Sequence, residues 1–506
     1  MGKTFLFLFF LLVFTSCFGQ SKLAPKFIEK VYSDIFNSMT NGKIKKPSLI
    51  VIEDSSKIIY YSPDLNSIVF SEKFTTVMRS FGVDSMNATA HVLGHELAHV
   101  ILQQGDFLKL GSGYADDQFN EKLKNYQGIL KDSLAFFERQ ADENAIFYAH
   151  ISGYQTTHIA GRVLNSIYLN FNLKDKKLKN YPELKERISM VESASKRMEV
   201  LLKFYDFGIM ATMKSQYDHA IYFFELIQTE KFYSKEIFNN LGSVYLMKVK
   251  SILKDKYPFE LPFQIDSYSS LSQQRDSPEK IELLIEASER SLNEAIRIDK
   301  NYYFALLNSL IREFLSGVDL IKLKKKIEIL ALDFPDKTDH WILFSICDFQ
   351  LGNEESAISM LTNLSKSNNL AILVKSQLSK VEYKNTQLEN FKQILPLIDI
   401  SRDTLYKKRG EDFRSQLKYL PQSSNSRIKV SIYNVDNNIF YNINFPGFAS
   451  FSISEYSVSL VNQYSIYNPN MFSGWMVYNS NGVVFVSNKQ YVLKYSNNQL
   501  INLYKF

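Results

Sequence analysis

The chain has 506 residues, a formal net charge of +6, seven histidines and two cysteines. This length predicts about three domains. Basic and acidic residues are interspersed, so the small positive charge forms no basic stripe and argues against a nucleic-acid partner. The two cysteines, one of which lies in the N-terminal apolar region, exclude an internal disulfide framework in the mature chain.

The N-terminus has the pattern of an export signal. A lysine precedes an unbroken apolar run over residues 5–14, which is too short to cross a membrane. We interpret residues 1–19 as a signal peptide that is cleaved after Gly19, and we predict export to the periplasm. In the alternative interpretation, residues 14–17 are a lipobox and a lipid on Cys17 tethers the protein to a membrane. Nothing after residue 20 approaches eighteen consecutive apolar positions, so we expect a soluble mature chain without a transmembrane segment.

Three short segments before residue 72 have the composition of β-strands. Residues 48–52, 58–61 and 66–71 are rich in isoleucine, valine, tyrosine and phenylalanine, and turn residues such as Pro63 and Asp64 separate them. We predict three short strands in this region.

The next segment contains the motif HELAH, formed by His95, Glu96 and His99 with the residues between them. On a helix, residues i and i+4 lie one above the other, so the two imidazoles can bind one zinc ion at about 2.0–2.1 Å. Glu96 then flanks the ion, where it can take a proton from the activated water and pass it to the leaving amine. The apolar residues Val92, Leu93, Leu97 and Val100 are expected to hold the opposite face in a core.

A chance occurrence of the motif is the competing interpretation, because it consists of only three specified residues. Three of the seven histidines lie between residues 91 and 99, which favours a site over chance. His91 offers another pairing with His95, but no glutamate follows it, and it lies about 12 Å from His99 along the helix. We interpret His91 as a residue that packs the helix or supports a ligand.

Catalytic zinc sites usually have three protein ligands, so a third must come from elsewhere in the chain. Residues 136–145 carry aromatic and small residues at helical spacing around two acids that lie one turn apart. Glu138 is the predicted third ligand. Asp142, on the same helix face, is predicted to accept a hydrogen bond from a ligating imidazole and to fix its tautomer. Alternatively, both acids belong to a solvated helix surface.

The motif HELAH, followed by Glu138-x-x-Ala141-Asp142 and then Gly153-Tyr154, resembles the gluzincin metallopeptidases. This family includes the CAAX-prenyl endopeptidases, the HtpX-like proteases and periplasmic relatives with tetratricopeptide repeats. The resemblance covers residues 25–200. It implies one Zn²⁺ per chain, and it implies that the predicted strands form a small sheet beside the cleft, whose edge binds a substrate as an added strand.

The segment from Tyr181 to Ile188 resembles a family segment that usually begins His-Pro and ends Arg-Ile. Here tyrosine replaces the histidine that lies near the metal in related proteins. This departure from the family pattern argues against a metal-capping role, and we expect Tyr181 to hydrogen-bond a developing oxyanion instead. At the matched position Arg187, the resemblance implies a cation that stabilises the site or faces the substrate. Alternatively, Arg187 is a surface residue of a charged helix.

From about residue 200 the pattern becomes that of helical repeats. The spacing of large and small residues is typical of tetratricopeptide units with a period of about 34 residues; it runs through Phe204, Phe207, Gly208, Ala220, Phe224, Phe238, Leu241, Gly242, Tyr245, Ser288, Leu292, Ala295, Trp341, Phe344, Gly352, Ala357 and Leu361. Residues 255–280, rich in Ser, Gln, Pro and charge, are predicted to be an inserted loop, and residues 302–335 are degenerate. Stacked repeats expose a concave face for an extended partner, here an envelope protein. The alternative is an ordinary helical bundle.

Residues 386–424 are predicted to form a charged helix and linker, and residues 425–506 a small all-β domain. Beyond residue 423, charged residues become rare while Tyr, Asn, Ser, Val and Ile alternate. A β-sandwich or barrel fits this pattern, with Asn481-Gly482 as a hairpin turn. The candidate strands are residues 430–433, 439–443, 457–461, 475–478, 483–486 and 491–495.

The predicted fold is therefore α+β and mainly helical. It consists of a gluzincin-like metallopeptidase domain over residues 22–199, a tetratricopeptide solenoid over residues 200–385 and the C-terminal β domain. The predicted function is that of an exported zinc endopeptidase that hydrolyses peptide bonds in envelope proteins. The alternative is a periplasmic scaffold or assembly chaperone, in which the zinc domain is latent or structural.

Overall fold

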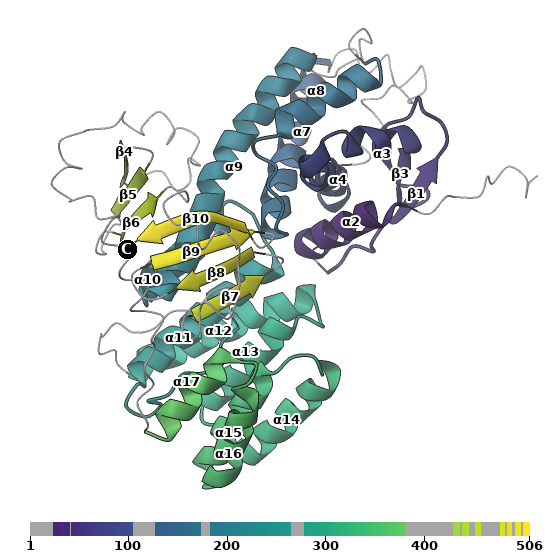
Figure 1. The fold of residues 1–506 in the computed structure, drawn as a ribbon. Helices are drawn as coiled ribbons and strands as arrows, with labels where there is room; N and C mark the ends of the chain where they lie inside the picture. The colour runs from purple at the N-terminus through teal and green to yellow at the C-terminus, as the bar shows by residue number, and fades with distance from the viewer. Residues whose placement is uncertain are drawn as a thin grey trace, which may run out of the picture. The chain divides into compact units, whose positions relative to one another are not determined.

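The structure is a computed structural model in which the chain is mainly helical, with one sheet near the N-terminus and another at the C-terminus (Figure 1). It describes residues 24–40, 42–104, 127–173, 183–264, 278–380 and, beyond residue 428, the strands named below. The chain divides into two units, Met1–Met198 and Glu199–Phe506, and the division falls within the helix α9, Leu184–Met213. Within the described ranges, no helix combines the length and the apolar character needed to span a membrane. The predicted signal peptide and linker lie outside these ranges.

The N-terminal sheet has three strands in the order β1-β3-β2, which confirms the prediction of three short strands in this region. These are β1 (Ser48–Ile52), β2 (Ile59–Ser62) and β3 (Ser67–Ser71). The central strand β3 is buried along its whole length and pairs parallel with β1 and antiparallel with β2. Because the N–H of Ser71 bonds the carbonyl of Ile58, the main-chain groups of Tyr61 point away from β3, toward the free edge of β2.

The helix α4 (Ser85–Ile101), which carries the HELAH motif, is the central helix of the first unit. A single 3₁₀ turn, η1 (Gly82–Asp84), precedes it. It contacts β2 and the helices α2 (Lys26–Met39), α3 (Glu72–Arg79), α7 (Gln127–Ile151) and α8 (Ala160–Asn170). Apolar and small side chains cover nearly all of its faces, so most of the helix is buried and belongs to the core.

Gly94 sets the distance between α4 and α7. A Cβ atom at this position would lie 3.0 Å from the Cα and 3.2 Å from the Cβ of Ala145. A glycine opposite an alanine therefore lets the two backbones approach closely. This approach brings the histidine face of α4 against the face of α7 that carries Glu138 and Asp142.

The second unit contains a run of helices after α9, in which each helix from α10 to α17 packs against the next in the chain. They are α10 (Tyr217–Thr229), α11 (Lys235–Ile252), α12 (Pro278–Ile298), α13 (Tyr303–Leu315), α14 (Leu320–Asp333), α15 (Asp339–Gln350), α16 (Glu354–Leu364) and α17 (Asn369–Leu378). The stretch that looked degenerate in sequence forms the pair α13 and α14. α11 also contacts α13, so alternate helices of the run adjoin.

Two glycines of the predicted repeat pattern lie at close contacts between helices. A Cβ at Gly208 on α9 would lie 2.9 Å from the ring of Phe224 on α10. A Cβ at Gly242 on α11 would lie 2.8 Å from the side chain of Leu292 on α12. The large residue of each pair thus fills the space that the glycine leaves, as the pattern of large and small residues requires.

The described strands of the C-terminal region form one antiparallel sheet in the order β4-β5-β6-β10-β9-β8-β7. They are β4 (Lys429–Val435), β5 (Asn438–Asn444), β6 (Phe451–Tyr456), β7 (Met476–Ser480), β8 (Val483–Ser487), β9 (Tyr491–Ser496) and β10 (Gln499–Lys505). This single sheet, with β4 and β7 at its ends, differs from the predicted sandwich or barrel. Ser480 pairs with Val483 across the predicted Asn481-Gly482 turn, whose own residues lie outside the described ranges.

A buried ion pair connects the C-terminal sheet to α9. The ammonium group of Lys494 on β9 contacts both carboxylate oxygens of Asp206, at 2.8 Å and 2.6 Å. The two residues are only 3% and 5% exposed. The pair therefore joins β9 to α9 through two buried, mutually compensated charges.

Candidate metal centre

His95 and His99 lie one turn apart on α4, and their side chains converge. Their Nε2 atoms are 3.0 Å apart and their ring planes are nearly perpendicular, at 87°. Each Nδ1 atom has a partner of its own: Asp142 Oδ1 lies 2.9 Å from that of His95, and Gln104 Oε1 lies 2.8 Å from that of His99. Because each Nδ1 atom faces a hydrogen-bond acceptor, the neutral form of each ring carries its proton on Nδ1. Its Nε2 is then the nitrogen that can bind a metal ion.

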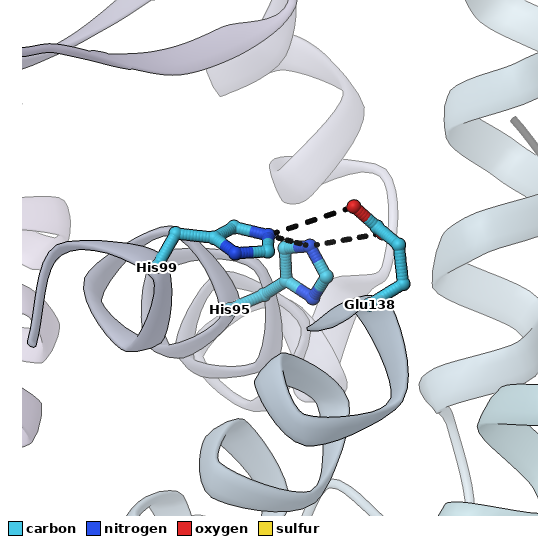
Figure 2. A group of neighbouring side chains, drawn as sticks. All are labelled: His95, His99 and Glu138. Atoms are coloured by element: carbon cyan, nitrogen blue, oxygen red, sulfur yellow. Dashed lines mark hydrogen bonds and ion pairs between the residues drawn. The ribbon is translucent and has the colours of Figure 1, made fainter. Parts of the chain in front are cut away.

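Glu138 on α7 completes a group of three (Figure 2). Its Oε2 lies 3.5 Å from Nε2 of His95, and its Oε1 lies 3.6 Å from Nε2 of His99. The glutamate is 5% exposed, and His95 is the most accessible of the three side chains. The structure therefore brings together the two histidines and the glutamate that the sequence singled out.

The spacing of these donor atoms fits a single ion. Ligands at about 2.0–2.1 Å around a tetrahedral zinc ion lie about 3.3 Å from one another. The three separations here, 3.0 Å, 3.5 Å and 3.6 Å, bracket that value. Two imidazole nitrogens and one carboxylate oxygen are also a donor set that zinc prefers. The group thus suits a zinc ion in both geometry and chemistry.

The short distance between the two Nε2 atoms requires a positive charge between them, since two lone pairs repel. A proton meets this requirement, and so does a metal ion. Burial lowers the pKa of His95, but hydrogen bonds to Asp142 and Glu138 outweigh burial and raise it to about 10. Burial lowers the pKa of His99 to about 4. Binding of a metal ion therefore competes with a proton held by His95.

Asp142 supports His95 and is itself held by Arg187 from the first turn of α9. The guanidinium donates to both carboxylate oxygens, at 3.0 Å from Nη2 to Oδ1 and through Nη1 to Oδ2. Burial would raise the pKa of Asp142, but the charge of Arg187 and the hydrogen bond from His95 hold it well below its usual range. Asp142 is therefore a permanent anion that orients the imidazole of His95.

Arg187 also contacts the third member of the group. Its Nη2 lies 2.8 Å from Oε2 of Glu138, and the residue is only 4% exposed. Against the effect of burial, His95 and Arg187 lower the pKa of Glu138 to about 2. The positive charge of the guanidinium thus compensates the negative charges of two buried carboxylates. Arg187 is therefore not the surface residue of the alternative interpretation, and its contacts with Glu138 and Asp142 fit stabilisation of the site.

His99 is supported by Gln104, a residue that the sequence did not single out. Two residues after the end of α4, Gln103 has a φ of 55°, and the chain folds back, with the N–H of Gln104 bonding the carbonyl of His99 at 2.9 Å. This turn places the Gln104 amide beside the imidazole. The amide nitrogen in turn donates to Oε1 of Gln140 on α7, at 3.0 Å. No local pattern distinguishes Gln104 from Gln103, so the sequence offered no signal for this role.

Glu96 lies next to His95 and is only partly buried. Its carboxylate accepts a hydrogen bond from the main chain of Tyr61, on the free edge of β2. Burial, together with the nearby charge of Glu138, raises the pKa of Glu96 to about 7. The predicted acid–base residue is therefore situated between the three converging side chains and the edge of the sheet.

A third histidine of α4 is not a member of this group. His91 is 5% exposed, its Nδ1 has no hydrogen-bond partner, and burial lowers its pKa to about 4. It does not belong to the group of three, in agreement with its interpretation as a packing or supporting residue. Tyr181 lies outside the described residues.

Comparison with known proteins adds no family to this description. No protein-family model matches the chain, and no curated protein matches it significantly. The function must therefore be argued from the site itself.

Proposed function

We propose that this protein is an exported, zinc-dependent endopeptidase of the gluzincin type, with tetratricopeptide-like repeats that recruit protein substrates or partners. The observation that carries the proposal is the convergence of His95, His99 and Glu138 on a volume that suits one ion. Both imidazoles have hydrogen-bonded Nδ1 atoms, an arrangement typical of zinc-ligating histidines.

The number of ligands favours a catalytic site over a structural one. Structural zinc sites surround the ion with four protein ligands, whereas catalytic sites have three and leave one position for water or substrate. Within the described ranges, His95, His99 and Glu138 are the only three potential ligands that lie close enough together to share an ion. One coordination position would then remain open.

The residues around this position have separate tasks in peptide hydrolysis. A bound zinc ion supplies Lewis acidity, which polarises a carbonyl group and lowers the pKa of water. Glu96 accepts the proton of the attacking water and donates it to the leaving amine. The outer edge of β2 binds the substrate as an added strand. Asp142 and Gln104 keep the imidazoles oriented.

The location and partners belong to the same proposal. Residues 1–19 direct export to the periplasm, where envelope proteins are the substrates; a lipid on Cys17 is the alternative anchor. The close contacts at Gly208 and Gly242 support the assignment of tetratricopeptide-like helix pairs, whose shared face recruits partners.

The proposal is tested with Glu96→Gln, which removes the acid–base group and keeps the side-chain volume. We expect this variant to bind about one zinc ion per chain and to hydrolyse unfolded casein about 10²–10⁴ times more slowly than the parent. A chelator should abolish activity of the parent, and zinc should restore it. Glu29→Gln, at an exposed position of α2, is the matched control and should leave both metal content and activity unchanged.

Equal casein hydrolysis by Glu96→Gln and the parent would remove the acid–base role. The scaffold alternative has its own signature in the same experiment. A scaffold would bind client proteins with or without the metal, and none of its preparations would hydrolyse casein.

A further inference from the structure

The chain after α11 contains a buried segment, residues 257–264, that has neither helical nor strand structure. It lies in the first half of the region that the sequence predicted to be an inserted loop. Its large apolar side chains, Tyr257, Phe259, Leu261 and Phe263, have exposed fractions of 3%, 4%, 0% and 2%, and Pro262 is buried as well. The large apolar residues stand at every second position, and a tight turn at Pro262, where the N–H of Phe263 bonds the carbonyl of Leu261 at 2.8 Å, interrupts the chain. We call residues 257–264 the inner segment.

Side-chain amides hold the main chain at the end of the inner segment. The N–H of Gln264 donates to Oδ1 of Asn308 at 2.8 Å, and its carbonyl accepts from Nδ2 of the same side chain at 2.6 Å. The same carbonyl also accepts from Nδ2 of Asn239 at 2.8 Å and, more weakly, from the hydroxyl of Ser243 at 3.4 Å. Asn239, Ser243 and Asn308 are fully buried, so they form a buried polar site for the main-chain N–H and C=O of one residue.

Further contacts hold the middle of the inner segment. The N–H of Glu260 donates to Oε1 of Gln377 at 2.7 Å, and its carboxylate lies 3.3 Å from the ammonium group of Lys250. The rings of Tyr257 and Phe259 pack against the ring of Phe314, with centroids 5.1 Å and 6.5 Å away.

The partners of the inner segment come from α11, α13 and α17, which alternate with other helices in the run. In a stack of helical pairs, alternate helices line one common face, which such proteins use to bind extended segments. The type of contact also resembles ligand binding. Hydrogen bonds from side-chain amides to the main chain accept many sequences, whereas pockets for alternate side chains select among them.

We propose that the face formed by α11, α13 and α17 is a binding groove for an extended peptide with a large apolar residue at every second position, and that the inner segment occupies it as an internal ligand. An acidic residue between the second and third apolar positions of the partner takes the place of Glu260 opposite Lys250. The proposal rests on the recruiting role of the repeats under the proposed function, and it is independent of the chemistry at His95.

An internal ligand competes strongly, because its covalent connection gives it an effective concentration in the millimolar range. A partner peptide must therefore bind the parent chain, whose groove is occupied, more weakly than it would bind an empty groove. Weakening the inner segment alone should increase the affinity for the partner, whereas weakening the groove should decrease it.

The test measures binding of a labelled peptide, acetyl-YPFELPFQ-amide, to the full-length chain by fluorescence anisotropy. In the variant Glu260→Lys, the inner segment is repelled by Lys250 while the groove is unchanged. We expect this variant to bind the peptide about tenfold more tightly than the parent, or better. The control is Glu286→Lys, a charge reversal at a position of α12 with a side chain 53% exposed, which should bind like the parent. A peptide whose four apolar residues are replaced by serine should not bind.

Amide hydrogen exchange of the parent chain provides a second measurement that needs no variant. Excess peptide should accelerate exchange at Glu260 and Gln264, whose N–H groups are held by Gln377 and Asn308, and leave α11 and α13 protected. Unchanged exchange at these two amides, or equal peptide binding by Glu260→Lys and the parent, would show that the inner segment is a permanent part of the core. Neither readout depends on zinc or hydrolysis, so this proposal and the proposed enzymatic function fail separately.

Discussion

The two histidines of the candidate metal centre are supported by unlike partners. His95 faces the carboxylate of Asp142, whereas His99 faces the neutral amide of Gln104. A carboxylate partner makes an imidazole more basic than an amide partner does, because it stabilises positive charge on the ring. His95 is therefore the stronger donor to a metal ion. The amide of Gln104 contributes orientation and tautomer selection, and it adds no charge to a pocket that already holds Glu138 and Asp142.

Replacement of Gln104 by leucine tests this orienting role. Without the amide, the ring of His99 loses the acceptor that fixes its Nδ1–H tautomer, and we expect zinc affinity to fall about 10–100-fold. Competition with a chromogenic chelator measures the affinity. The adjacent variant Gln103→Gly is the control, because it relieves the left-handed backbone conformation at a φ of 55°. It should raise the free energy of unfolding by about 1 kcal/mol and leave the affinity unchanged. An equal loss of affinity in both variants would assign the effect to the helix end.

The candidate centre is built from two helix turns that face each other. α4 contributes His95 and His99 at positions i and i+4, and α7 contributes Glu138 and Asp142 with the same spacing. Each helix thus presents one face, and His95 contacts both acids of the other helix. The separation of the two backbones decides whether all of these contacts form together, and the contact between Gly94 and Ala145 sets that separation.

We therefore expect Gly94→Ala to impair the centre although the residue binds nothing. The added Cβ would lie 3.0 Å from a backbone atom of α7, so the helices must move apart. The free energy of unfolding should fall by about 1–3 kcal/mol, and zinc affinity should fall with it because Glu138 moves away from the histidines. Titration with zinc and thermal unfolding measure the two effects.

Gly161→Ala on α8 is the matched control for this variant. Its new Cβ would meet only the side chain of Glu192, at 3.7 Å. It should be neutral or stabilise the protein by up to about 1 kcal/mol, with zinc affinity unchanged. Parental zinc affinity in Gly94→Ala would contradict the argument that backbone separation positions Glu138.

Local patterns in the sequence predicted the elements better than their contacts. The period of four residues placed His95, His99, Glu138 and Asp142 on helix faces, because this period depends only on helix geometry. The fold-back that brings Gln104 to His99 depends on the backbone conformation of one glutamine, which no local pattern specifies. The resemblance to a family pointed to Arg187, but only the structure places its guanidinium between two buried carboxylates.

The same distinction applies to the second unit. Alternating apolar residues predicted several C-terminal strands, but residues 451–456 and 499–505 were missed, and the order of strands in the sheet was not predicted. Pairing order depends on contacts between strands that are distant in the chain, on which local alternation carries no information. For residues 257–264, two prolines and a polar neighbourhood indicated a loop, so the burial of the four large apolar side chains was not predicted.

The link between the C-terminal sheet and the helices of the second unit is also testable. Lys494 and Asp206 are both buried, so removing one partner leaves an uncompensated charge in the interior. We expect Lys494→Met and Asp206→Leu each to lower the free energy of unfolding by about 3–5 kcal/mol, and the double variant to recover most of the loss, because two apolar side chains of similar volume leave no buried charge.

Thermal unfolding of the full-length chain gives the comparison, and Lys300→Met, at an exposed lysine, is the control that should stay within about 0.5 kcal/mol of the parent. Recovery in the double variant identifies charge compensation as the reason that both residues are needed. If the double variant instead shows the sum of the two single losses, the residues contribute separately, and the sheet does not depend on this pair for its attachment to α9.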